Sequence, residues 1–200
     1  MGRPATNKKQ NLIDTAIELM WKNSYGSVSV DDICKTAEVN KGSFYYYFKS
    51  KAELAIAALE AHYEELKPLY DDVFSPTLAP KERFLRLAEA ELEYQQRVFD
   101  KYGLVCGCPF VTIGTEMAAL DEGIRSKVDE VYQSYERYFE SALNDLISEG
   151  LIDKDTDTKE RAQQIHGFIL GQMTIARIQN SLVPLQECFK NGLLRLVGLT

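Results

Sequence analysis

The stretch Ser29–Lys51, SVDDICKTAEVNKGSFYYYFKSK, predicts a helix-turn-helix. Ser29 is suited to cap a short first helix, because Asp32 follows three residues later and the pair matches a capping box. Asn40 is suited to cap a second helix, and the residues before it fit a tight turn in which Val39 plugs the space between the two helices. The stretch therefore indicates two short helices held at a fixed angle.

The aromatic run of the second helix divides by helical spacing. Phe44, Tyr47 and Phe48 share one face, which we expect to pack against the first helix. The rest of the helix combines a lysine, a glycine, a serine and two phenols, which suit the phosphates and groove edges of DNA: Lys41, Gly42, Ser43, Tyr45 and Tyr46. Lys49 and Lys51 flank Ser50, which is a candidate cap of the next helix. The N-terminus of that helix favours phosphate. The alternative is an aromatic-rich core helix beside solvated lysines.

The segment KGSFYYYFKSK, residues 41–51, resembles the DNA-binding head of the TetR/AcrR-like transcriptional regulators. Departures from the pattern of that family are Cys34, Glu38 and Tyr46, of which Tyr46 bears on base preference. The resemblance implies a homodimer that reads operator DNA, most simply as a repressor, with the second helix in the major groove. It also implies the residues that contact DNA: Ser29, Lys41, Gly42, Ser43, Tyr45, Tyr46, Tyr47 and Lys51.

Charge separates the beginning of the chain from the rest. The net charge is -7, which alone argues against nucleic acid. Residues 1–51, however, contain eight Lys and Arg against five Asp and Glu, whereas the remaining 149 contain 15 against 25. A basic head on an acidic body would steer only that end of the molecule toward phosphate. The resemblance implies a DNA-binding domain at 1–51 and a ligand-binding and dimerisation domain at 52–200. Arg3, in a basic N-terminal arm, is predicted either to enter the minor groove or to remain solvated.

The rest of the sequence predicts helices alone, about nine in all. Helical periodicity runs through residues 8–23, 52–74, 81–102, 108–120, 121–149, 158–180 and 184–197. Gly26 is suited to a left-handed position after the helix over 8–23. Pro68 is expected to kink the long helix over 52–74. No apolar run approaches the ~18 residues that a membrane span needs. We therefore expect an all-α cytoplasmic protein that has no contact with a membrane.

The segment GLVCGCPF, residues 103–110, is a candidate sensing site. Pro109 fits the first turn of a helix, which places Cys108 at a helix N-terminus, where a thiolate is favoured. The segment is similar to that of TetR-like regulators that respond to electrophiles or oxidants, and this similarity implies that Cys108 is the sensing thiol and Cys106 an additional one. The alternative is that both are small buried residues beside a pocket.

A reversible ligand pocket in the second domain is the broader expectation from the resemblance. Its candidate residues are aromatic or apolar, with two polar anchors: Tyr94, Phe110, Met117, Tyr135, Phe168, His166 and Gln172. The resemblance also implies that the last two helices form the dimer interface, here through Gly167, Gly171, Ile175 and Leu193, although the two glycines could instead admit a neighbour of the same chain. We predict no cofactor, no metal site and no enzymatic activity, since no catalytic motif is recognised. The alternative function is an all-α interaction module that does not bind DNA.

Overall fold

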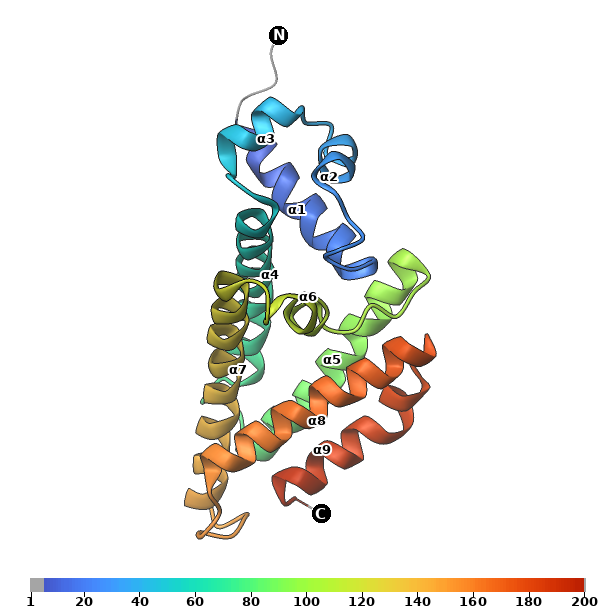
Figure 1. Ribbon diagram of the computed structural model, residues 1–200. Helices are drawn as coiled ribbons and strands as arrows, with labels where there is room; N and C mark the ends of the chain where they lie inside the picture. The colour runs from blue at the N-terminus through green and yellow to red at the C-terminus, as the bar shows by residue number, and fades with distance from the viewer. Residues whose placement is uncertain (1–5, 200) are drawn as a thin grey trace. The chain divides into compact units, whose positions relative to one another are not determined.

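The computed structural model describes residues 6–199, and within them the chain forms nine α-helices, one π-helical segment and no strand (Figure 1). The prediction of an all-α fold is confirmed. Arg3 lies outside the described residues. The elements are α1 (Thr6–Lys22), α2 (Val30–Thr36), α3 (Lys41–Tyr47), α4 (Lys51–Val73), α5 (Pro80–Tyr102), α6 (Pro109–Met117), α7 (Glu122–Ser148), α8 (Thr158–Gln179), η1 (Leu185–Phe189) and α9 (Lys190–Val197).

The helices form two compact units. The head unit contains residues 6–65 and 108–130, and the body unit contains residues 66–107 and 131–199. Helices α4 and α7 therefore each begin in the head unit and end in the body unit. Helix α6 belongs to the head unit, although it lies far from α1–α3 in the sequence. The predicted domain boundary between residues 51 and 52 stays a prediction.

The helix-turn-helix is built from local hydrogen bonds. The Ser29 hydroxyl accepts from the Asp32 amide at 3.1 Å while the Asp32 carboxylate accepts from the Ser29 amide at 2.9 Å, which completes a capping box. The Asn40 side chain accepts from the Ser43 amide at 2.8 Å and caps α3. Glu38 is left-handed with φ of 54°, which is unusual for a residue with a side chain, and it turns the backbone between the two helices.

The apolar faces of these helices form the core of the head unit. Phe44 is fully buried and Phe48 is nearly so, as their helical spacing predicts, and Val39 is buried in the turn. Helices α2, α3 and α6 all pack on α1, whose Leu12 and Met20 are fully buried. Figure 1 shows α2 and α3 beside α1. The sequence pattern therefore places α3 with one face inward and one face outward.

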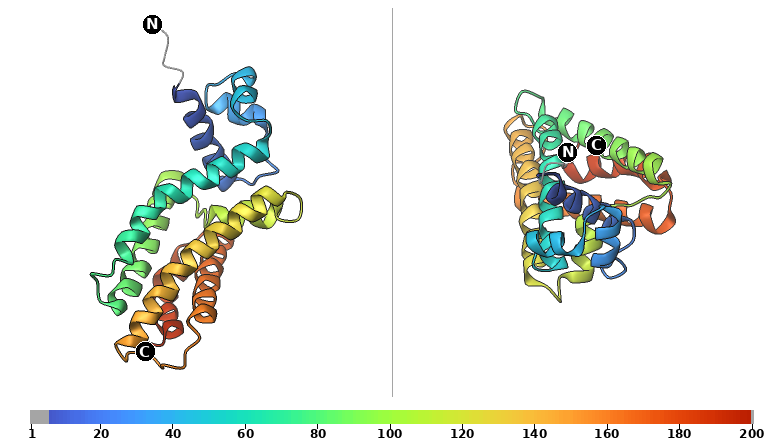
Figure 2. Two further views of the ribbon diagram at one scale, coloured as in Figure 1. Left: turned by 90° about the vertical axis from the view of Figure 1, so that its left-hand side faces the viewer. Right: turned by 90° about the horizontal axis from the view of Figure 1, so that it is seen from above.

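Aromatic packing dominates the body unit. The Tyr70 ring of α4 lies 4.4 Å from that of Tyr135 on α7. The ring of Phe74, the residue after the end of α4, lies 5.9 Å from Phe84 of α5 and 5.6 Å from Phe139 of α7. Such pairs supply both large buried area and a preferred geometry. Figure 2 gives two further views of these helices, including α8 and α9, which pack against each other.

Two local predictions are wrong. Gly26 is not among the glycines with positive φ, which are Gly103, Gly107, Gly150 and Gly198. The helix predicted over 184–197 is divided into η1 and α9. In this region the Phe189 ring stacks on Phe168, and a Cβ at Gly192 would lie 2.4 Å from that same ring. This packing, which the periodicity of the sequence does not report, accompanies the wider π-helical turn.

The length and hydropathy of the helices test whether any of them could cross a membrane. Within residues 6–199, every helix is either too short or too polar to span a bilayer.

Pro68 lies inside α4, and the helix continues through it to Val73.

Candidate nucleic-acid interface and sensing site

The outward face of α3 carries two exposed phenols. Tyr45 and Tyr46 are 58% and 81% exposed, and Lys41 and Gly42 are also exposed. Tyr47 is half-buried, between the exposed face and the core. Tyrosines are enriched at interfaces, because the ring supplies apolar area while the hydroxyl makes a hydrogen bond. The face therefore has the composition of a surface that binds a polar partner.

The Lys41 ammonium is engaged within the head unit. It forms an ion pair with Asp31 of α2 at 2.7 Å, with the two side chains 55% and 66% exposed. This hydrogen bond and charge raise the pKa of Lys41, so the side chain is fully positive at neutral pH. An exposed pair of this kind is weak, and a phosphate can therefore replace Asp31 as the partner of Lys41.

The Lys51 ammonium is also engaged within the head unit. Its ammonium donates to the carbonyls of Tyr25 and Val28, both at 2.9 Å, and lies 4.0 Å from the centre of the Tyr25 ring. Burial lowers the pKa of Lys51. The residue therefore joins the first turn of α4 to the loop between α1 and α2.

The turn before Cys108 is held by side chains of the body unit. Gly107 is left-handed with φ of 66°, and a Cβ there would lie 3.2 Å from the Met173 carbonyl oxygen. Gln95 donates to the Gly107 carbonyl at 3.2 Å, Arg177 donates to the Cys106 carbonyl, and Asn180 accepts from the Val105 amide at 2.9 Å. Glycine is the residue that this turn requires.

The two candidate sensing thiols differ in accessibility. Cys108 is the N-cap residue of α6 and is half-buried, whereas Cys106 is 2% exposed. No disulfide joins any of the four cysteines, all of which lie within the described residues, and Cys188 on η1 is exposed. Cys108 is therefore the more accessible of the pair, and Cys188 is a competing site for any thiol reagent.

The structure divides the residues predicted to line a ligand pocket between the two units. The head unit contains Cys108, Phe110 and Met117, and the body unit contains Cys106, Tyr94, Tyr135, His166, Phe168 and Gln172. Several already have packing partners. The Phe110 ring lies 5.8 Å from His62, Tyr135 lies 4.4 Å from Tyr70, and Phe168 stacks on Phe189.

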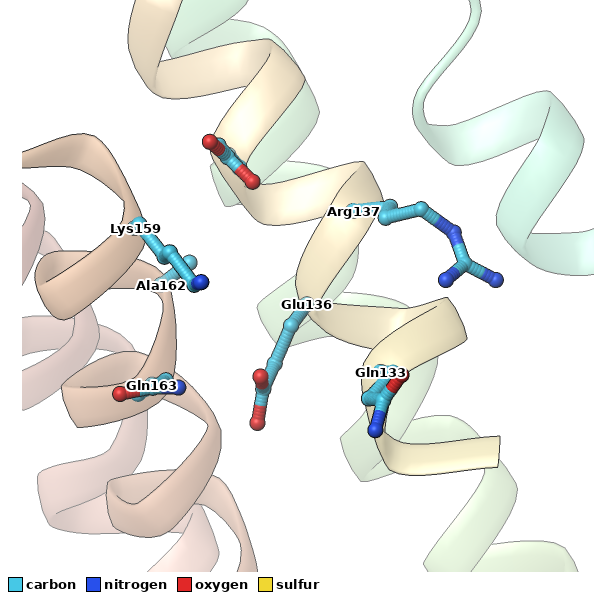
Figure 3. Close-up of a pocket in the computed structure, with 7 residues that line it drawn as sticks. Gln133, Glu136, Arg137, Lys159, Ala162 and Gln163 are labelled. Atoms are coloured by element: carbon cyan, nitrogen blue, oxygen red, sulfur yellow. The ribbon is translucent and has the colours of Figure 1, made fainter. Parts of the chain in front are cut away.

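A polar pocket lies between α7 and α8 of the body unit. It has a volume of about 330 Å³ and is lined by Gln133, Glu136, Arg137, Glu140, Lys159, Ala162 and Gln163. In Figure 3 the Glu136 side chain extends into the space beside α8, while Arg137 points away from that helix. Glu136 also meets His166, whose Nδ1 lies 3.1 Å from its carboxylate. Burial lowers the pKa of His166, although the Glu136 carboxylate opposes that shift. The predicted pocket residue His166 therefore contacts the lining of this pocket.

The residues predicted for a dimer interface are exposed except for one. Gly167 and Gly171 lie on the surface of α8, and a Cβ at either would meet no atom within 4 Å, so they do not admit a neighbour of the same chain. Ile175 is 42% exposed one turn further along α8. Leu193 is fully buried within its own chain and therefore offers no surface to a second copy.

Sequence reasoning missed the long-range partners of these segments. Glu116 of α6, Gln95 of α5 and Arg177 of α8 all bind backbone groups that lie 12 to 91 residues away. No local pattern marks them, because the backbone groups that they bind lie outside any short sequence window. Within residues 6–199, no cluster of three or more His, Cys, Asp and Glu side chains suits a metal ion.

Comparison with known proteins covers both units. Residues 12–58 match the family described as bacterial regulatory proteins, tetR family, and residues 80–190 match the family described as tetracyclin repressor-like, C-terminal domain. The chain is 32% identical to the transcriptional regulator AcuR of Cereibacter sphaeroides over 81% of its own length and 75% of that protein. It is 28% identical to the transcriptional repressor NemR of Escherichia coli over 90% and 88% of the two chains.

Solved structures agree with these matches. The crystal structure of E. coli NemR in its reduced form covers 94% of both chains with a TM-score of 0.78 at 26% identity. The match to the crystal structure of regulatory protein TetR from Rhodobacter sphaeroides covers 94% of this chain and 96% of that one, with a TM-score of 0.79 at 29% identity. Regulators of this kind bind operator DNA and small molecules and act as dimers. The protein therefore belongs to the TetR family and is a transcriptional regulator with a helix-turn-helix that binds DNA.

Proposed function

We propose that the protein is a homodimeric repressor that leaves its operator when a small molecule binds the body unit or when Cys108 is modified. The observation that carries the DNA-binding part is the division of α3, whose Phe44 is fully buried while Tyr45 and Tyr46 are exposed on the opposite side. An interaction module that does not bind DNA would need another purpose for this face. Two relatives, AcuR and NemR, are described as a transcriptional regulator and a transcriptional repressor.

The proposed DNA contacts follow from exposure. Lys41, Gly42 and Ser43 begin α3 and approach the base edges, where Gly42 allows the backbone to come close. Tyr45, Tyr46 and Ser29 donate to phosphates through their hydroxyls. Tyr47, being half-buried, contributes through the edge of its ring. Two copies joined through the exposed face of α8, at Gly167, Gly171 and Ile175, would present two such helices to successive major grooves.

In vitro selection from a duplex library with a random-sequence core tests this proposal. We expect the enriched sequences to be near-palindromic, with half-sites one or more helical turns apart. Fluorescence anisotropy with excess competitor DNA then measures specific binding, and light scattering measures the mass of the complex. A selection that enriches no sequence contradicts the proposed function, and a complex with a single copy of the protein contradicts the dimer.

Tyr45→Phe is expected to weaken binding to every DNA sequence by about 1 kcal/mol, since it removes one hydrogen bond to phosphate. Tyr94→Phe in the body unit is a matched control, because it makes the same chemical change away from α3. Anisotropy titrations of both variants on selected and on random duplexes measure the effect. Equal affinity of Tyr45→Phe and the wild type would remove Tyr45 from the DNA interface.

Lys51→Met is expected to leave the salt dependence of DNA binding unchanged, because the Lys51 ammonium already binds two backbone carbonyls. Lys41→Met, in contrast, should reduce the slope of log K against log salt concentration by about 0.9, as the loss of one phosphate contact does. Titrations across a range of potassium chloride concentrations measure both slopes. A reduced slope for Lys51→Met would instead show that Lys51 contacts a phosphate, as the sequence predicts.

Cys108 is the proposed sensing thiol on two grounds. It is the more accessible of the neighbouring thiols, and it occupies the N-cap position of α6, where the helix dipole favours a thiolate. Helix α6 packs on α1 in the head unit, so an adduct at its first turn can displace a helix that supports the helix-turn-helix. The structure of the relative NemR is of a reduced form, which fits redox chemistry in this branch of the family. A reversible ligand in the body unit is the second proposed signal, and the pocket between α7 and α8 is one candidate site.

Alkylation of Cys108 with N-ethylmaleimide is expected to weaken operator binding by at least tenfold, as a bulky adduct at the first turn of α6 must move that helix. The parent protein for this test carries Cys188→Ser, because Cys188 is exposed and would react first. Mass spectrometry locates the adduct and anisotropy measures affinity. In the parent that also carries Cys108→Ser, the reagent should have no effect. An equal loss of affinity in that variant would assign sensing to another thiol.

A further inference from the structure

The loop between α1 and α2 is held by two oppositely charged side chains. The Glu116 carboxylate accepts from the amides of Tyr25 and Gly26 at 2.9 and 2.7 Å, with a separate oxygen for each. From the other side, the Lys51 ammonium donates to the carbonyls of Tyr25 and Val28. Four charge-assisted hydrogen bonds therefore act on residues 25–28, and such bonds are the stronger ones in proteins.

The loop leads directly into the DNA-binding helices. The residue after Val28 is Ser29, which caps α2 and is itself a proposed phosphate contact. Only hydrogen bonds between Ser24 and Ser27 and between the backbones of Tyr25 and Val28 tie the loop to itself in the described structure. The place where α2 begins therefore depends on groups outside the loop, and Glu116 supplies the pair of acceptors for its amides.

We propose that Glu116 is a positioning residue for DNA binding: its carboxylate fixes the α1–α2 loop and so aligns α2 and α3 for the operator. The proposal rests on the proposed function, because it concerns the same DNA-binding surface. Glu116 does not contact DNA in this scheme. It reduces the entropy cost of DNA binding, because a loop that is already in place loses less conformational freedom when the complex forms.

The sign of the effect separates this role from simple electrostatics. Glu116 is negative, so its removal reduces repulsion of phosphate and by itself would strengthen DNA binding slightly. A positioning role predicts the opposite, a roughly tenfold weaker affinity, which corresponds to the loss of one well-formed hydrogen bond to a charged group. Glu122→Ala is the matched control, because Glu122 is 84% exposed on α7 of the same unit and pairs only with the exposed Arg125 in the described structure.

Gly26→Ala provides an independent variant that keeps the charge. A Cβ at position 26 would lie 2.5 Å from Oε1 of Glu116, so the methyl group must push the carboxylate away from the amides. No other atom lies close except Cδ of Glu116, at 3.7 Å, which leaves the rest of the head undisturbed. Glu116→Gln retains one acceptor and should fall between the wild type and Glu116→Ala.

The experiment measures anisotropy on the selected duplex for the wild type and for Glu116→Ala, Glu116→Gln, Gly26→Ala and Glu122→Ala, at a temperature where circular dichroism shows each to be folded. Hydrogen exchange of the Tyr25 and Gly26 amides is measured in parallel. We expect faster exchange and about tenfold weaker binding in Glu116→Ala and Gly26→Ala, with an unchanged salt slope, and unchanged or tighter binding in Glu122→Ala.

The outcomes are distinguishable. If the wild type binds the duplex and Glu116→Ala binds it as tightly or more tightly, the positioning role is overturned and the proposed function stands. If exchange of the two amides is unchanged in Glu116→Ala, the hydrogen bonds do not order the loop, and the inference fails at its first step. If selection with the wild type enriches no sequence, the proposed function is overturned, and the inference fails with it.

Discussion

Phe44→Ala is expected to lower the free energy of unfolding of the head unit by about 3–5 kcal/mol, the usual range for a buried phenylalanine. The Phe44 side chain is fully buried beneath α3, so its loss removes apolar contacts and leaves a cavity between α3 and the helices under it. Because this is a large part of the stability of a small domain, we expect operator binding to be lost as well.

Chemical denaturation followed by tryptophan fluorescence measures this effect. Trp21 is the single tryptophan of the chain and lies 5% exposed on α1, so its emission reports on the head unit. Tyr46→Ala is the control from the same helix, since Tyr46 is 81% exposed. It should change stability by no more than about 0.5 kcal/mol while weakening DNA binding. Similar losses of stability in both variants would show that the two faces of α3 are not divided as described.

Acidification is expected to destabilise the head unit through His62 by about 3 kcal/mol between pH 6.5 and 4. His62 of α4 is 4% exposed, and its ring lies 5.4 Å from Trp21 and 5.8 Å from Phe110. Burial lowers the pKa of His62 from its ordinary value of 6.5 to about 4. The Glu65 carboxylate lies 3.8 Å away and favours the charged ring, but it is 76% exposed, so water screens it and burial dominates.

The direction follows from proton binding. Between pH 6.5 and 4 the unfolded chain binds a proton at His62 and the folded chain does not, so protons draw the protein toward the unfolded state. The contribution of His62 to the free energy of unfolding is fully present above pH 6.5. It declines as the pH falls and levels off below pH 4. Trp21 fluorescence during denaturation at each pH measures the decline. His62→Leu should have a flatter profile over this range, and identical profiles for the two proteins would contradict the assignment.

Phe44 and Phe48 illustrate what helical periodicity predicts well. The spacing of Phe44 and Phe48 predicts their burial, and Ser29 and Asn40 cap α2 and α3 as their residue types indicate. Such features depend on groups within about four residues of one another, and a short sequence window contains all of the partners. The fold class and the family follow from them.

The partners of charged and polar side chains depend on the tertiary structure instead. Lys51 is one of several lysines near the helix-turn-helix, yet its ammonium faces the loop carbonyls. Leu193 and Ile175 are both apolar residues on C-terminal helices, but the first is core and the second is surface. Sequence spacing gives a helix two faces without stating which neighbour covers each one.

The sequence by itself therefore determined the all-α fold, the caps of α2 and α3, the inward face of α3 and the resemblance to the TetR family. Only the tertiary structure decided that α6 belongs to the head unit and that Glu116 holds amides 90 and 91 residues away. The physical reason is the range of the interactions. Caps and helical stripes arise from hydrogen bonds and spacing along a few residues, whereas the partner of an exposed carboxylate is set by how distant helices pack, which no local pattern records.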